Sequence, residues 1–87
     1  MVSKQVTVTN AQGVHMRPAG ELAGKMTQYP CEVKIRYRDK TIDAKSPMNL
    51  IAACIKCGAQ IEVVCEGEEE QSALDAAVAM IEAGFGE

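Results

Sequence analysis

The sequence has 87 residues, which suits one domain with a single modest core, and we assign residues 1–87 to that domain. Its 47% hydrophobic content excludes a disordered chain, and no apolar run approaches the ~18 residues of a membrane helix, so we expect a soluble, cytoplasmic protein without membrane insertion. Residues 1–58 sum to a charge of +5 and residues 59–87 to −8. This asymmetry indicates that one end of the fold meets acidic partners. A last helix whose acidic residues simply face water explains the asymmetry equally well.

No dense basic run with interleaved aromatic residues occurs, which argues against direct binding of nucleic acid.

In chain order, alternation of apolar and polar residues first predicts a strand over residues 2–9, and the turn NAQG, closed by Gly13, follows it. From residue 16 the apolar spacing becomes helical. Pro18 fits the first turn of this helix, and Pro30 ends it by about Tyr29. Its expected inner stripe consists of Met16, Ala19, Leu22, Ala23, Met26 and Tyr29.

Two more alternating segments, residues 32–38 and 41–44, predict a hairpin with a short connection. Ser46 is a good N-cap and Pro47 takes the favoured first position of a short helix that Gly58 ends. One face of this helix carries Met48, Ile51 and Ala52. A strand over residues 60–66 and a helix that starts at Glu68–Glu70 and is capped by Gly84 complete the chain.

The predicted order of elements is β-α-β-β-α-β-α. Because every strand has one polar face, we expect an antiparallel sheet that is open to water on one side. The three helices then cover its other side. The sequence therefore predicts an α+β fold, an open-faced two-layer sandwich of a four-stranded antiparallel sheet and three helices.

His15, the only histidine, lies in the stretch GVHMRP, where a glycine turn meets a helix. The first N–H groups of a helix have no internal partner and form an anion site. Imidazole is a nucleophile that can carry a phosphoryl group, Arg17 can add charge-assisted hydrogen bonds, and Pro18 fixes the first turn. A surface histidine without a role is the plain alternative, and the residues alone do not separate phosphoryl transfer from simple anion binding.

The stretch GVHMRPAG resembles the active-site signature of HPr, the histidine-containing phosphocarrier family of the bacterial phosphoenolpyruvate:sugar phosphotransferase system. The stretch KSPMNLIAA resembles the second signature of that family, its serine site. The resemblance spans nearly the whole chain. It implies the HPr-like fold and a carrier of phosphoryl groups rather than a turnover enzyme, without a cofactor and without a metal.

The resemblance also implies roles and partners. Phosphorylated enzyme I passes its phosphoryl group to Nδ1 of His15, Arg17 steadies the group, and a histidine on a sugar-specific IIA domain of a sugar permease receives it. Partners dock on a patch around the first two helices, and we expect a monomer. The matching partner-binding residues are Met16, Gly20, Lys25, Lys45, Pro47, Met48 and Ile51, with Lys56 at the edge. Packing into the core is the alternative for Met48 and Ile51.

Ser46 as an N-cap needs no further function, but the resemblance adds phosphorylation as a regulatory signal. In Gram-positive relatives an ATP-dependent HPr kinase/phosphorylase modifies the matching serine, and the product serves as corepressor for a catabolite control transcription factor. Enteric relatives carry a serine without that kinase, and the sequence leaves both cases open. A regulatory relative that acts through phosphoserine alone is a third reading, against which His15 argues.

Two positions depart from the family pattern: Pro47 replaces a larger apolar residue and Cys54 replaces glycine. Cys54 and Cys57 form a CxxC motif, which can bind zinc or exchange disulfides. A zinc site needs four ligands, and Cys54 is expected late in its helix rather than at a helix start. We therefore favour incidental thiols here and small core residues at Cys31 and Cys65.

Overall fold

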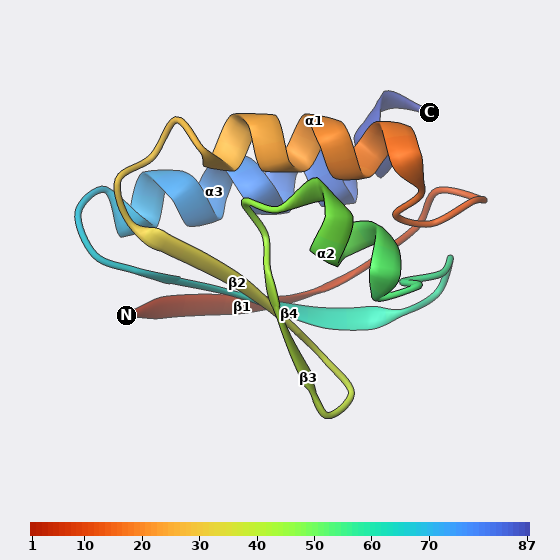
Figure 1. Ribbon diagram of the computed structural model, residues 1–87, viewed down its shortest axis with the longest axis horizontal. Helices are drawn as coiled ribbons and strands as arrows, with labels where there is room; N and C mark the ends of the chain where they lie inside the picture. Colours follow the sequence, from red (N-terminus) through yellow and green to blue (C-terminus); the bar gives the residue numbers. More distant parts are fainter.

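The computed structural model describes residues 1–87 and confirms the predicted α+β sandwich. All strand pairs are antiparallel, in the order β1-β4-β2-β3. Helices α1 and α3 lie side by side over one face of the sheet, and α2 packs against α1 (Figure 1). No helix is long and apolar enough to cross a membrane. The elements are β1 (Val2–Thr7), α1 (Met16–Met26), β2 (Glu32–Tyr37), β3 (Lys40–Asp43), α2 (Pro47–Ala52), β4 (Gln60–Glu66), α3 (Glu70–Glu82) and the 3-10 turn η1 (Gly84–Gly86).

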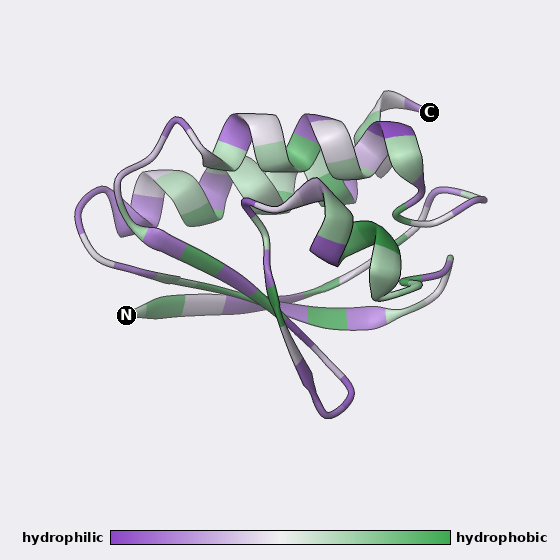
Figure 2. Ribbon diagram, in the orientation of Figure 1, coloured by the Kyte–Doolittle hydropathy of each residue, from purple (hydrophilic) through white to green (hydrophobic).

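The sheet is held in register by its alternating sequence. Along the strands, apolar residues face the helices and polar residues face water, except for Val64, which lies opposite Ser3 and Lys34 on the open face, and Figure 2 shows the corresponding bands. On the core face, β4 places Ile61 opposite Val6 of β1. On the open face, Arg36 forms an ion pair with Glu62 across β2 and β4, at 3.5 Å. A one-residue slip would therefore exchange the buried and the solvated sets.

Two predictions about which helix residues face the core are wrong. Met16 is the first residue of α1, ahead of the turns whose side chains are buried, so it lies outside the inner stripe and is 76% exposed. In α2 the predicted face carries Met48 and Ile51, which are 77% and 37% exposed, whereas Leu50 is fully buried. Packing of Met48 and Ile51 into the core is thus excluded.

Helix α2 is also shorter than predicted. It ends at Ala52 rather than near Gly58, because Cys54 adopts the left-handed conformation with φ 55°. Cys54 therefore lies after the helix and not late within it. The segment that follows buries Ile55 and runs as turns toward β4. This early ending brings residues 55–59 against the loop between β1 and α1.

The conformation of Cys54 leads to a stability prediction. A left-handed backbone costs a non-glycine residue roughly 1–2 kcal/mol, whereas glycine loses about 0.5–1 kcal/mol of chain entropy on folding. We expect Cys54→Gly to raise the free energy of unfolding by about 0.5–1 kcal/mol, measured by denaturant titration. Cys57 has no positive φ, so the control Cys57→Gly should lower stability. A gain of equal size in both variants would contradict this account.

Candidate functional site

His15 is the N-cap residue of α1. Its backbone is extended, with φ −84° and ψ −165°, and its carbonyl oxygen accepts the helical bond from Ala19 at 3.0 Å. The first amides of a helix have no partner within it, and the side chain of His15 makes no capping bond to those of α1. The imidazole itself is 32% exposed. The predicted juxtaposition of a histidine with a helix start is therefore present in the structure.

The loop before His15 is fixed by close backbone contact with the segment after α2. Gly13 has φ +66°, and a Cβ atom there would collide with the carbonyl oxygen of Ile55 and lie 2.8 Å from Cα of Lys56. The amide of Val14 donates to that same Ile55 oxygen at 2.9 Å. Only glycine fits this approach at position 13. The contact sets where the chain enters α1, and thereby where His15 stands.

Glu87 reaches the same point from the other end of the sequence. Its Oε2 atom lies 2.6 Å from Nε2 of His15 and 2.7 Å from a guanidinium nitrogen of Arg17. Its Oε1 atom accepts a hydrogen bond from Nδ2 of Asn10 at 2.8 Å. The carboxylate of Glu87 thus lies beside His15 and Arg17, at Nε2 of the ring, whereas the phosphoryl group is expected at Nδ1.

The turn η1 directs Glu87 to this place. Gly84, Phe85 and Gly86 all have positive φ values, of 64°, 55° and 76°, so the chain folds back toward the first turn of α1. Phe85 is buried and anchors the turn in the core. Its carbonyl oxygen lies 3.5 Å from both terminal nitrogens of Arg17. Figure 1 shows the last residues beside the start of α1.

Arg17 is divided between two carboxylates. It binds Glu87 as described, and it also binds Glu21, one helical turn further along α1, at 2.7 Å. The hydrogen bond that Arg17 donates to Glu87 is the main cause of the raised pKa of Arg17. Pro18 is buried in the first turn of α1, as predicted. The site therefore holds a fully charged guanidinium that is 49% exposed and able to exchange partners.

The pKa of Glu87 is lowered from its ordinary value of 4.5 to about 2. The hydrogen bond from Asn10 contributes most, while those from His15 and Arg17 add to it and burial opposes it. The carboxylate is therefore ionised at every physiological pH. Nothing in the sequence analysis pointed to Asn10 or Glu87. The signals that could have found them are the excess of acids after residue 58 and the glycines that flank Phe85.

The predicted docking residues lie on α1, on α2 and in the segments beside them. Met16, Met48 and Ile51 are three of the four large apolar residues that the molecule exposes. Gly20, Lys25, Pro47 and Lys56 are exposed too. Lys45 differs, because its ammonium group donates to the carbonyl oxygen of Tyr29 at 2.7 Å and so ties the start of α2 to the end of α1.

Ser46 caps α2 as predicted. Its Oγ atom accepts a hydrogen bond from the amide of Asn49 at 3.3 Å, and Pro47 stands at the first helical position. Ser46 is half-buried at the surface. A group added to Oγ would therefore stand at the N-terminus of α2.

No three of the four thiols lie together. Cys31 and Cys65 are buried in the core, as predicted, and burial raises the pKa of Cys65 to about 11. Cys54 and Cys57 are exposed and neither is in a disulfide, while the Cys57 thiol donates to the carbonyl oxygen of Thr9 at 3.7 Å. No group of three histidine, cysteine, aspartate or glutamate side chains is close enough to hold a metal ion.

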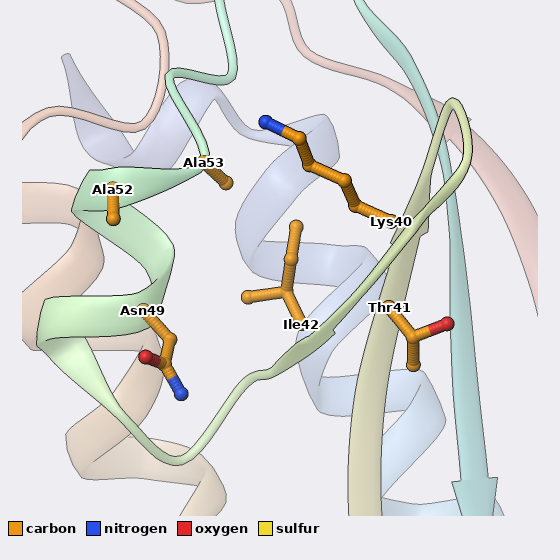
Figure 3. A pocket seen from close by; sticks show the side chains of 6 residues that line it. All are labelled: Lys40, Thr41, Ile42, Asn49, Ala52 and Ala53. Carbon is orange, nitrogen blue, oxygen red and sulfur yellow. The ribbon is translucent and has the colours of Figure 1, made fainter.

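The largest pocket lies elsewhere, between the edge strand β3 and α2. Figure 3 shows Lys40 on β3 and Asn49 on α2 among its lining side chains, and Lys40 is its one ionisable residue. None of the predicted site residues lines it; the lining residues are Lys40, Thr41, Ile42, Asn49, Ala52 and Ala53. His15 consequently stands on an open surface rather than in a small-molecule pocket, a geometry that suits reaction with a group on another protein.

Comparisons with known proteins agree with this geometry. The family profile described as "PTS HPr component phosphorylation site" matches residues 2–83. The phosphocarrier protein HPr of Pseudomonas putida is 33% identical over the whole of this chain and 98% of its own length. The HPr-like protein Crh of Halalkalibacterium halodurans is 37% identical over 94% of this chain and 98% of its own length.

A solved structure of an HPr protein has the same fold as this chain. The crystal structure of HPr from Thermoanaerobacter tengcongensis superposes with a TM-score of 0.95 at 28% identity, over 100% of this chain and 98% of that one.

The lowered pKa of Glu87 predicts a pH dependence of stability. Because the pKa is lower in the folded state, the ionised carboxylate stabilises the fold above pH 4.5, and this contribution is lost as the pH falls to about 2. We expect Glu87→Gln to be less stable than the native protein at pH 7, with a gap that closes between pH 4.5 and 2, followed by thermal unfolding. The control Glu82→Gln removes an exposed carboxylate of α3, and its effect should not follow that pattern. A gap for Glu87→Gln that stays constant down to pH 2 would refute the contact.

Proposed function

The chain belongs to the HPr family of phosphocarriers, and on that premise we propose that His15 accepts a phosphoryl group from phosphorylated enzyme I and passes it to IIA domains of sugar permeases. The observation that carries the proposal is the position of His15, at the N-cap of α1 with a side chain that caps nothing. A phosphoryl group on its ring would face the unpaired first amides of the helix.

Arg17 is proposed to steady the phosphoryl group. Its present partners, Glu21 and Glu87, are partly exposed carboxylates, and exposed ion pairs are weak. A phosphoryl group offers more charge and three acceptor oxygens, so it can draw the guanidinium away from them. Pro18 fixes the first turn without adding a competing N–H group. The protein returns unchanged after two transfers and acts as a carrier rather than a turnover enzyme, without a cofactor.

The surface around α1 and α2 is proposed as the docking face for both partners. Exposed methionines adapt to differently shaped surfaces, and Met16 and Met48 project from neighbouring helices. Lys25 and Lys56 add positive charge, which favours acidic partners. Lys45 contributes by fixing α2 against α1.

Ser46 is proposed as a regulatory site. A phosphate on Oγ would add about −1.5 to −2 charges at the N-terminus of α2. That charge is compatible with the helix end but would repel an acidic partner on the docking face. Similarity to Crh of Halalkalibacterium halodurans keeps a second candidate function, in which phosphorylated Ser46 alone acts through a kinase and a catabolite control transcription factor. His15 and Arg17 favour the carrier function, because a purely regulatory protein does not need them.

The first test is phosphorylation of His15. Incubation with enzyme I and phosphoenolpyruvate should add one acid-labile phosphoryl group to the native protein and to Ser46→Ala, but none to His15→Ala, measured by intact mass. An HPr that the same enzyme I is known to phosphorylate serves as a positive control. No gain in the native protein, while that control is phosphorylated, would refute the carrier function and favour the regulatory one.

The second test concerns Ser46. Ser46→Asp should slow the phosphorylation of His15 about tenfold at low salt, through repulsion of the acidic partner, and added salt should narrow the difference. Ser46→Asn is the matched control, since asparagine also caps helices and has the same size as aspartate without the charge. Equal rates in Ser46→Asp and Ser46→Asn would argue against electrostatic regulation at this site.

A further inference from the structure

Asn10 is the only polar side chain that the fold buries, with 5% of its surface exposed. Its Nδ2 atom donates to the carbonyl oxygen of Gly13 at 2.6 Å and to Oε1 of Glu87 at 2.8 Å. Its Oδ1 atom is buried and has no hydrogen-bond partner. An unpartnered buried oxygen is unfavourable, so a neutral amide is retained here at a cost to stability. This arrangement indicates that the two hydrogen bonds donated by Nδ2 have a functional role.

The orientation of the amide follows from its partners. The Gly13 carbonyl and the ionised Glu87 carboxylate can only accept hydrogen bonds, so Nδ2 has to face both. Asn10 thereby connects the turn before His15 with residue 87. Gly84 packs against the same position, with a Cβ site 3.7 Å from Cβ of Asn10. The carboxylate of Glu87 is thus held by a buried and immobile donor.

The other oxygen of Glu87 determines the protonation of His15. Since the carboxylate carries no proton, the 2.6 Å contact requires Nε2 of His15 to be the donor. In the neutral imidazole the proton then resides on Nε2 and the lone pair on Nδ1. A carboxylate that orients an imidazole in this way is a common device in nucleophilic catalysis.

We propose that Asn10 is a positioning residue for phosphoryl transfer: by holding Glu87 against Nε2 of His15, it keeps Nδ1 unprotonated as the nucleophile. The inference rests on the proposed carrier function. The hydrogen bond from Asn10 is also the main cause of the low pKa of Glu87, which keeps the carboxylate ionised.

The transfer step balances with this arrangement. The donor is a phosphohistidine whose other ring nitrogen carries a proton. The Nδ1 lone pair of His15 attacks phosphorus, the nitrogen–phosphorus bond of the donor breaks, and its electron pair stays on the donor ring, which becomes a neutral imidazole. The ring of His15 keeps its Nε2 proton and gains a positive charge. Glu87 faces that charge directly.

The test replaces Asn10 by aspartate, which has the same shape but offers no donor. Asp at position 10 would repel both Glu87 and the Gly13 carbonyl, so Glu87 should leave Nε2. Nitrogen NMR of His15, the only histidine, should show the Nε2–H tautomer in the native protein at alkaline pH and a larger share of Nδ1–H in Asn10→Asp. The rate of phosphorylation by enzyme I should fall several-fold.

Three further variants make the result specific. Gln12→Glu adds the same charge to the same loop at an exposed position and should leave the tautomer ratio unchanged. Asn10→Ala removes the donor without adding a charge and should shift the ratio in the same direction, which covers the case that Asn10→Asp does not fold. The pair Asn10→Asp with Glu87→Gln exchanges amide and carboxylate, and it should restore the Nε2–H tautomer.

The outcomes separate the two proposals. An unchanged tautomer ratio in folded Asn10→Asp and Asn10→Ala, or no restoration in the exchanged pair, would overturn the role of Asn10. Failure of the native protein to accept a phosphoryl group would overturn the carrier function instead, and the tautomer measurement would still decide whether Asn10 positions Glu87.

Discussion

The contact between Gly13 and the Ile55 carbonyl is the constraint on which the functional surface depends. Three backbone hydrogen bonds surround it: Val14 to Ile55, Gly58 to Val8, and Val8 to Ala59. Together they join the loop before α1 to the segment after α2. Because Gly13 carries no side chain, the two segments approach more closely than packed side chains would allow. The direction of α1, and with it the place of His15, follows from that approach.

The same contact explains why α2 is short. A helix continued to Gly58 would carry residues 55–58 away from the loop and leave the amide of Val14 without its partner. The left-handed turn at Cys54 ends the helix before that happens. A non-glycine residue is unfavourable there, which shows that tertiary contacts outweigh the local preference of the chain. The exposed side chains of Met48 and Ile51 also follow, since one turn and a half of helix buries little more than Leu50.

The sheet could be predicted from the sequence because alternation is a local signal with a strict period, as in Glu32–Tyr37 and Gln60–Glu66. His15 and Ser46 could be predicted because helix starts have local signatures in glycine, serine and proline. The exposure of Met16 and Met48 could not be predicted from the helical spacing of apolar residues, which does not tell a buried face from an exposed one; only the family resemblance placed both on the docking patch. Glu87 lies 72 residues from His15, and nothing in an exposed glutamate identifies its partner. Asn10 has meaning only once Glu87 is in place.

The resting site divides its contacts between a fixed neutral part and a movable charged part. Asn10 is buried and bound to Gly13, whereas Arg17 is 49% exposed and bound to two exposed or half-exposed carboxylates. Exposed ion pairs contribute little and exchange readily, whereas a buried hydrogen bond is costly to break. Arg17 can therefore turn to an incoming phosphoryl group without disturbing the part that orients the imidazole. Had Glu87 been held by Arg17 alone, the move that stabilises the phosphoryl group would also release the group that prepares the nucleophile.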